Sequence, residues 1–479
     1  MTYKPVGADE TGHFPPRVTA ALNATYVPNW KATTAYLAGD KVLSPGGDVV
    51  SAKVNFTSGA SYSSANWDLS ASYVTPADGD AKYARLGSVV RPVIKRTAPA
   101  STKLTQGGGT PAGTGTVTLA DTTDFASGTS AVKILSGGTG AFRLYLFPSI
   151  GTWDLSAHHL RILIKVPDWT NVNELYVRAS SDAGTGYRQW NINESPSGIN
   201  KRILRPGEWA WIDLIRTDAT TIVGAVNWAA INDIRVFFTD KNATAVTIQI
   251  NGIERIPDPA GLPNGAVIFT CDDLHISHWT IAKPKLDQVG APGVAFPIIG
   301  NVGGSSMSAA QLTALRDYSG WEIGAHAYDN TEHAAGFAGK TEAQLRTIFD
   351  RLKSLNAQNG FGSDVLAWPN GDSDTLAQRV AREYFTTARG TTNGTQSANY
   401  DNAMNTRAWG ITSTATAQGY IDRAKSGRGI AQFVMHAIVP SGPTGLDTLQ
   451  SDFEATVDYA VAQGVPIMTT AQVLQAVGK

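Results

Sequence analysis

Carboxylate and imidazole side chains gather in the C-terminal half of the chain, where their positions predict a reactive site. Asp272 and Asp273 form an adjacent pair, and His326 and His436 follow later in the chain. The aspartate pair and each of the two histidines come after an apolar run typical of a buried strand. Adjacent carboxylates repel each other unless a cation holds at least one of them. The sequence therefore predicts a metal or acid–base site built from three strand ends. The three runs are residues 265–271, 321–324 and 432–435.

A parallel sheet would bring these strand ends together. After the Pro257-Asp258-Pro259 break, strand-like runs alternate with helical patterns, which is typical of an α/β barrel or a wound sheet with functional loops at the carboxyl ends of its strands. We expect strands at 266–271, 294–299, 321–324, 365–368, 429–435 and 466–469. We expect helices at 308–318, 341–355, 375–385, 446–463 and 470–477.

The region before this break has a different composition and a different pattern of apolar residues. The chain has 48 Gly and 23 Pro and only 16% charged residues, which favours turn-rich β structure over long charged helices. Seven short strand-like runs without helical patterns predict a β-sandwich or jelly roll, with His158 and His159 in a loop and without a metal role. The runs are 141–147, 160–166, 174–180, 187–192, 208–214, 233–238 and 245–250.

At 479 residues the chain exceeds what one hydrophobic core supports, so we expect several domains. The Gly-rich run at the end of the linker is not expected to pack. The predicted parts are an N-terminal anchoring segment (1–28), a small β module resembling chitin-binding-type modules (29–74), a linker (75–115), the β-sandwich (116–258) and the α/β region (262–479).

Four segments of the last region, "VIFTCDDLH", "GWEIGAHAYDNTEH", "AWPNGD" and "FVMHAIV", stand in the order and approximate spacing of the polysaccharide deacetylases of carbohydrate esterase family 4. The resemblance implies a deformed (β/α) barrel and an enzyme that removes N- or O-acetyl groups from a polysaccharide. It also implies a divalent metal ion, with Zn²⁺ expected, which lowers the pKa of bound water and polarises the acetyl carbonyl.

The same resemblance assigns roles to individual residues. Asp272 would be the general base, His436 the general acid, and Asp273 a metal ligand together with His326. The backbone N–H of Asn370 would stabilise the oxyanion. We expect the substrate to contact Trp368, Pro369, Phe433, Met435 and His275, although His275 and His278 could instead cap a helix or lie in solvent.

The chain departs from the family pattern in two places. The family has two histidines four residues apart, but Asn330 stands at that distance from His326 and the next histidine is His333. Either a short insertion loops out and His333 ligates the metal, which we favour, or Asn330 or Asp329 replaces it, with His333 then a surface residue.

The second departure is in the third segment, where Ala367 replaces the arginine that orients the catalytic base in the family. This replacement leaves the base without its usual partner unless Arg389, at the end of "YFTTARG", reaches it.

Other features bear on partners and location. Near-equal numbers of basic (39) and acidic (40) residues exclude a strong field for nucleic acid, and no apolar stretch approaches a membrane span or the core of a secretory signal. The segments "GADETGHFPPRV", "AYLAGDKVLSPGG" and "DGDAKYARLGS" resemble the N-terminal regions of phage tail fibres and tailspikes.

This second resemblance implies a homotrimer that is synthesised in the host cytoplasm and mounted on the virion by tail or baseplate proteins. Such a protein would act on host cell-surface polysaccharide. The alternative is a catalytically inactive receptor-binding protein that only binds the glycan.

Overall fold

The computed structural model describes residues 33–36, 41–43, 49–57, 59–61, 63–71, 111–113, 115–140, 142–146, 151–192, 203–242, 244–304, 306–362, 364–400 and 402–478. The chain divides into two compact units, Met1–Ala100 and Ser101–Lys479. Within the described ranges, no helix is long and apolar enough to cross a membrane.

The first unit contains a small β module. A three-stranded antiparallel sheet has the order β2-β3-β5, and a separate antiparallel pair joins β1 to β4. The predicted anchoring segment 1–28 and residues 75–110 of the predicted linker lie outside the described residues. The elements are β1 (Ala35–Tyr36), β2 (Lys41–Leu43), β3 (Val49–Ala52), β4 (Phe56–Thr57), η1 (Ser64–Asn66) and β5 (Trp67–Ala71).

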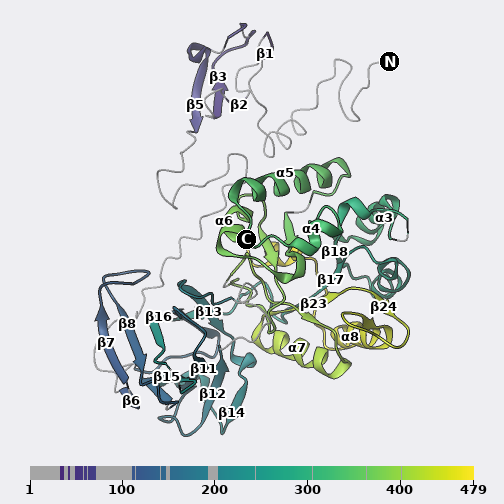
Figure 1. Cartoon of the computed structure of the whole chain (residues 1–479). Coiled ribbons are helices and arrows are strands. Elements are labelled where there is room, and N and C mark those ends of the chain that lie inside the picture. The colour runs from purple at the N-terminus through teal and green to yellow at the C-terminus, as the bar shows by residue number, and fades with distance from the viewer. Residues whose placement is uncertain are drawn as a thin grey trace. The chain divides into compact units, whose positions relative to one another are not determined.

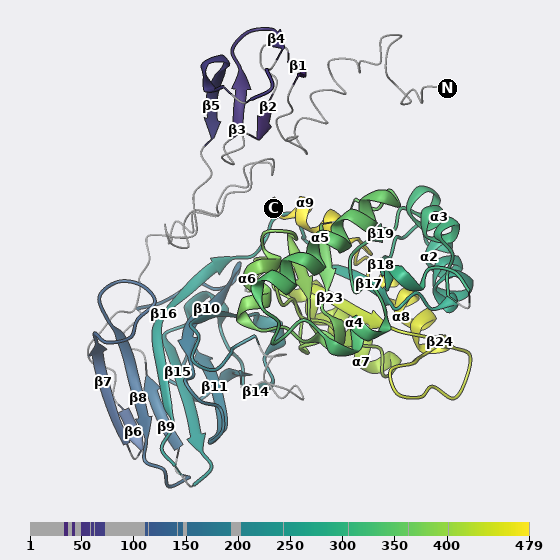
Figure 2. The same cartoon turned by 45° about the horizontal axis from the view of Figure 1, so that its top comes forward.

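The second unit begins with two antiparallel sheets (Figures 1 and 2), as the turn-rich sequence predicts. Their apolar side chains form one buried core that includes Ile162, Val177 and Phe238. One sheet has the order β13-β10-β16-β8-β7, with β7 (Gly115–Asp121), β8 (Ala131–Ser136), β10 (His158–Lys165), β13 (Ala210–Leu214) and β16 (Thr247–Pro257). The other has the order β14-β12-β11-β15-β9-β6, with β6 (Pro111–Gly113), β9 (Phe142–Leu146), β11 (Val172–Ser180), β12 (Tyr187–Asn191), β14 (Thr221–Val223) and β15 (Asp233–Asp240).

Two expectations for this part of the chain are wrong. Part of the run at the end of the predicted linker does join regular structure, because Pro111–Gly113 forms strand β6 at the edge of its sheet, a position where proline is tolerated since one side needs no ladder hydrogen bond. His158 and His159 lie in strand β10 rather than in a loop, and His159 is buried. The sequence analysis also missed β7, β8 and β14.

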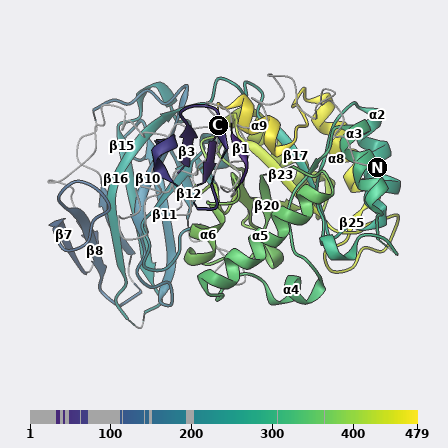
Figure 3. The same ribbon diagram turned by 90° about the horizontal axis from the view of Figure 1, so that it is seen from above.

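The C-terminal part is a parallel α/β structure (Figure 3). Five parallel strands have the order β19-β18-β17-β23-β22, and β20 pairs in parallel with β21. Parallel bridges Ala325↔Leu366 and Arg389↔Thr406 connect the two groups, so the strands follow one another around a ring. The strands are β17 (Ala266–Asp272), β18 (Val294–Phe296), β19 (Glu322–Ile323), β20 (Val365–Ala367), β21 (Thr387–Arg389), β22 (Trp409–Gly410) and β23 (Ile430–Met435), with a small pair β24 (Ile438–Val439) and β25 (Thr448–Leu449) beyond the ring.

Helices cover the outside of this ring. The predicted helices form with small shifts, and Ser308, Thr341 and Thr469 begin three of them with capping boxes. The predicted strand at 466–469 is reduced to the bridge Val267↔Ile467, and α2, α4 and α7 were not predicted. The helices are η6 (His278–Ala282), α2 (Lys283–Gln288), α3 (Ala309–Ser319), α4 (Asn330–Ala335), α5 (Glu342–Gln358), α6 (Thr375–Ala381), α7 (Thr414–Gly427), α8 (Gln450–Ala462) and α9 (Thr470–Ala476).

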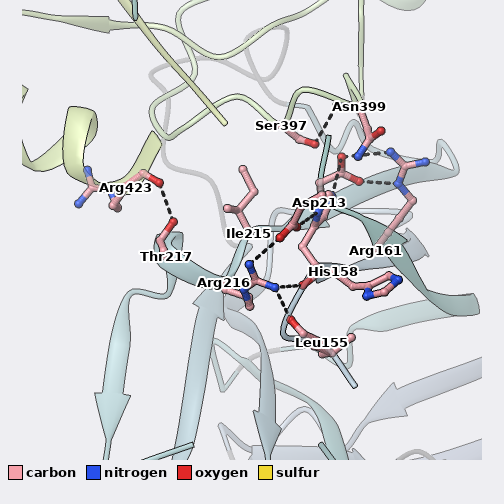
Figure 4. Close-up of polar contacts among 12 residues, drawn as sticks. Leu155, His158, Arg161, Asp213, Ile215, Arg216, Thr217, Ser397, Asn399 and Arg423 are labelled. Atoms are coloured by element: carbon pink, nitrogen blue, oxygen red, sulfur yellow. Dashed lines mark hydrogen bonds and ion pairs between the residues drawn. The ribbon is translucent and has the colours of Figure 1, made fainter. Parts of the chain in front are cut away.

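The sandwich contacts the α/β part directly. The short helix η4 (Arg216–Asp218) lies against α7, where Thr217 Oγ1 donates to the backbone carbonyl of Arg423 at 2.8 Å (Figure 4). A Cβ on Gly427 would lie 2.5 Å from both Ile215 Cγ2 and Thr217 Oγ1, so this approach requires glycine.

Candidate active site

Asp272 and Asp273 stand where strand β17 turns into the following segment. Asp272 is the last residue of the strand and is buried. Asp273 and Leu274 both have left-handed backbone conformations, with φ of 67° and 63°. Such conformations are strained for residues other than glycine and persist at sites where the surrounding structure enforces them. This sharp turn directs the two neighbouring carboxylates to different partners.

Asp273 forms a cluster with two histidines. Its Oδ1 lies 3.4 Å from His326 Nε2 and 3.6 Å from His333 Nε2. One ligand atom from each of the three residues lies within 4.8 Å of the others, and the two imidazole rings are 4.8 Å apart. The structure therefore brings together the three side chains that the sequence analysis assigned to a metal ion.

The donor atoms of this cluster fit a divalent cation. His326 Nδ1 lies 2.8 Å from the carbonyl oxygen of Ala367, which can only accept, so Nδ1 carries the proton and a neutral His326 presents a lone pair at Nε2. Among the described residues, neither this Nε2 nor Asp273 Oδ1 has a hydrogen-bond partner, although both atoms are buried. Two imidazole nitrogens and one carboxylate oxygen are ligands that zinc prefers at catalytic sites.

The electrostatics agree with an ionised carboxylate at this position. Burial alone would raise the pKa of Asp273, but its contact with His326 and the charge that His326, His333 and His436 can carry outweigh burial and lower the pKa well below its usual range. Asp273 therefore stays ionised over the physiological pH range.

The seven-residue spacing between the histidines has a simple structural cause. His326 lies on an extended segment between the bridges Ala325↔Leu366 and Ile298↔Ala327, whereas His333 lies on the separate helix α4. The two histidines thus reach one point from different elements and not from one helical turn.

The other candidate ligands near His333 have different partners. Asp329 caps helix α4 by accepting from the backbone N–H of Glu332 at 2.8 Å. Asn330 Oδ1 accepts from Asn301 Nδ2 at 2.7 Å. Of the three alternatives that the sequence left open, the structure brings only His333 to Asp273.

Asp272 has an arginine partner from another strand. The guanidinium of Arg389 contacts Asp272 Oδ2, while Asp272 Oδ1 is buried and has no hydrogen-bond partner among the described residues. Arg389 ends β21 and is the register partner of Ala367 on β20. Position 367 carries alanine where the family has arginine, but Arg389 stands beside it on the adjacent strand.

His436 follows strand β23 and lies on the other side of Asp273. Its Nε2 is 3.8 Å from Asp273 Oδ2, and its side chain is 21% exposed. Its backbone carbonyl is 2.7 Å from Nε2 of the buried His278. Burial lowers the pKa of His278 to about 4, so His278 is neutral and donates this hydrogen bond. His278 is therefore neither solvent-exposed nor at a groove rim. Its hydrogen bond to the backbone of His436 was not predicted from the sequence.

These groups face a common pocket of about 400 Å³, a volume typical of small-molecule sites. Asn370, Ile411, Val434 and Leu446 line it together with the charged residues. Trp368 also borders it, but its side chain is fully buried and donates from Nε1 to the carbonyl of Met404 at 2.7 Å. Asn370 has a left-handed backbone, with φ of 58°, and its Nδ2 donates to the carbonyl of His333 at 2.9 Å.

Four of the residues predicted to contact the substrate do not line this pocket. Phe433 and Met435 are fully buried in the core, because side chains alternate along strand β23 and Val434 and His436 take the pocket face. Pro369 is also buried and is not among the residues that line the pocket. His275 is half-buried, with its ring 5.8 Å from that of His278, and does not line the pocket either.

Comparisons with known proteins give distant likenesses. No protein-family model and no curated protein matches the chain. Parts of it resemble solved structures, including a family 4 carbohydrate esterase from Streptomyces lividans, which is 20% identical with a TM-score of 0.29 over 43% of this chain and 92% of that one. The Streptococcus pyogenes deacetylase PplD is 18% identical, with a TM-score of 0.27 over 30% of this chain and 62% of that one. A structure of carbohydrate-binding modules of the β-sandwich superfamily is 15% identical, with a TM-score of 0.23 over 31% of this chain and 57% of that one.

Proposed function

We propose that the α/β part of this chain is a metal-dependent deacetylase that hydrolyses acetyl groups on a carbohydrate. One observation carries the proposal: a buried, arginine-paired carboxylate, Asp272, stands beside the Asp273–His326–His333 cluster on the wall of one pocket. The four sequence segments that resemble the polysaccharide deacetylases supply these same residues.

Asp272 acts as the general base in this proposal. Its Oδ2 is held by Arg389, and Oδ1 is the oxygen left to accept a proton from the attacking water. Arg389 also fixes the orientation of the carboxylate, and it acts through Asp272 without touching the reacting atoms.

His436 acts as the general acid from the opposite side. Its Nε2 is near Asp273 and the side chain reaches the pocket, so it can donate a proton to the departing alcohol or amine. A divalent ion held by Asp273, His326 and His333 would supply the Lewis acid that activates water and polarises the acetyl carbonyl. The backbone N–H of Asn370 is the proposed oxyanion donor, and Val434 and Ile411 are apolar neighbours for the acetyl methyl group.

The finer parts of the proposal concern substrate and location. We propose a bacterial surface polysaccharide with N- or O-acetyl groups as the substrate, and a phage tail as the site of action, with the protein as a homotrimer attached to baseplate proteins. Sequence resemblances in the first 88 residues support the location. Light scattering of the full-length chain tests the trimer, since a monomeric mass would contradict it.

Acetate release tests the activity. Wild-type protein loaded with zinc should release acetate from acetylated bacterial wall or capsule preparations, and Asp272→Asn should abolish the release while circular dichroism shows an intact fold. If wild-type protein binds the glycan without releasing acetate from any preparation, the enzyme is ruled out in favour of a receptor-binding protein.

A further inference from the structure

A second cavity, of about 430 Å³, lies between the sandwich and the α/β part, next to the pocket described above. Both parts belong to the same compact unit. Asn393 lines both cavities, so the two are adjacent at this residue. Ligand sites occur preferentially at interfaces between domains, and both volumes fall in the usual range for such sites.

The walls of the second cavity carry hydrogen-bonding groups from both sides. The sandwich contributes Asn191 and Thr220, which are exposed, and the α/β part contributes Arg407 and Arg423, which are half-buried. The Thr220 hydroxyl already donates to the carbonyl of Gln189 at 3.1 Å, so the Asn191 amide and the guanidiniums, which have several N–H groups each, are the main source of donors for a ligand. This mixture suits a ligand rich in hydroxyl groups better than an apolar one.

Hydrogen bonds across the interface hold the shared wall in place. Asp218 of the sandwich accepts from the backbone N–H of Thr395 at 2.9 Å and from its Oγ1 at 2.7 Å. Arg407 Nη1 donates to the carbonyl of Asn393 at 3.1 Å, and Arg423 Nε lies 3.1 Å from Asp218 Oδ1. The segment that separates the two cavities is therefore fixed by both parts, and a ligand spanning them would meet a preorganised surface.

We infer that the second cavity binds sugar units of the same glycan chain that presents its acetylated unit to Asp272. This inference rests on the proposed function. A polymer with one unit in the first pocket must continue beyond it, and at Asn393 it meets a cavity whose polar groups match its hydroxyls. The sandwich is then part of the substrate-binding surface and not only a spacer.

A cavity-filling variant tests the inference. Ala219 lines the second cavity on the sandwich side, is half-buried and has an ordinary extended backbone. Ala219→Trp should fill the cavity without removing a hydrogen-bonding side chain. Ile222→Trp is the matched control, because Ile222 lies three residues away, is 66% exposed and does not line the cavity.

Calorimetric titration with the hexamer of N-acetylglucosamine and with acetylated xylohexaose gives a readout that does not require turnover. We expect Ala219→Trp to weaken binding of at least one hexamer by about tenfold, while Ile222→Trp binds like wild type. Equal binding by all three proteins, or no binding of either hexamer by wild type, overturns the inference. Acetate release from the matching acetylated monosaccharides reports separately on the proposed function, and Ala219→Trp should leave it unchanged.

Discussion

The guanidinium of Arg389 contacts the carboxylate of Asp272, and the two side chains are only 2% and 4% exposed. The register of the parallel pair β20–β21 places Arg389 directly beside Ala367. An arginine on either strand at this level would point toward the end of β17. The pairing thus gives the Asp272 carboxylate a cationic partner although position 367 carries no charge.

Removal of this arginine should impair catalysis. Outer-shell groups that orient metal ligands typically contribute about 10- to 100-fold to activity. Arg389 orients the proposed general base in a similar way, so Arg389→Ala should lower kcat/KM for acetate release by about 10- to 100-fold. The variant also leaves a buried carboxylate unpaired, which costs roughly 3–5 kcal/mol of stability. Thermal unfolding measured alongside activity separates the two effects. Wild-type kcat/KM in a folded Arg389→Ala protein would contradict the role.

Moving the arginine back gives a sharper test. Because Ala367 and Arg389 are register partners, the double variant Ala367→Arg/Arg389→Ala should return a guanidinium to Asp272 and recover part of the activity that Arg389→Ala loses. Ala367→Arg alone serves as the control, since it crowds a second arginine into the buried core and should not raise activity. A double variant no more active than Arg389→Ala would show that the two strand positions are not equivalent.

The metal cluster predicts different effects for two neighbouring residues of helix α4. His333→Ala should lower the zinc content of purified protein and its acetate release, because it removes one of three ligand atoms. Asn330→Ala should change neither, because Asn330 bonds to Asn301. Elemental analysis after dialysis against a chelator and zinc restoration measures both. Full zinc occupancy in His333→Ala together with loss in Asn330→Ala would reverse the assignment.

Much of this site could be predicted because its residues follow strands with strong apolar patterns. Asp272, Asp273, His326 and His436 each stand at or near such a strand end, and the structure brings them to one pocket. The alternation of side chains along β23 assigns Val434 to the pocket and Phe433 to the core, so the sequence pattern already contains this distinction.

Other features depend on contacts distant in sequence and could not be predicted. The partnership of Ala367 with Arg389 follows from strand register, and the bond from His278 to the carbonyl of His436 joins residues 158 positions apart. Strand β6 contains proline and glycine and forms because β9 offers a free edge to it. Such features are visible only once the chain is folded.

The lowered pKa of His278 predicts that the folded protein becomes less stable as the pH falls. Its pKa is lowered to about 4 by burial, whereas an unfolded histidine titrates near 6.5. Between these values the unfolded state binds the extra proton, so the free energy of unfolding should fall by about 1.4 kcal/mol for each pH unit below 6.5. His278→Gln keeps an N–H donor for the carbonyl of His436 and should lose this dependence. Thermal unfolding from pH 7 to pH 4 tests it, and parallel curves for the two proteins would contradict the prediction.

The raised pKa of His159, in the sandwich, predicts a pH dependence of stability with the opposite sign. Its ring is buried between Asp258, at 3.4 Å from Nδ1, and Asp213, at 3.7 Å from Nε2. Burial opposes protonation, but the two carboxylates outweigh it and raise the pKa of His159. Arg161 pairs with Asp213 (Figure 4) and Arg216 pairs with Asp258, so both carboxylates stay compensated when the histidine is removed.

Because the folded pKa of His159 lies above the unfolded value, the stabilisation is complete below about pH 6.5 and is lost as pH rises through the folded pKa. Wild type should therefore exceed His159→Gln in thermal midpoint at pH 6, and the difference should shrink toward pH 9. His278→Gln is the control, since its effect belongs to the acid range. A difference between wild type and His159→Gln that stays constant from pH 6 to pH 9 would show that His159 is neutral in the folded protein.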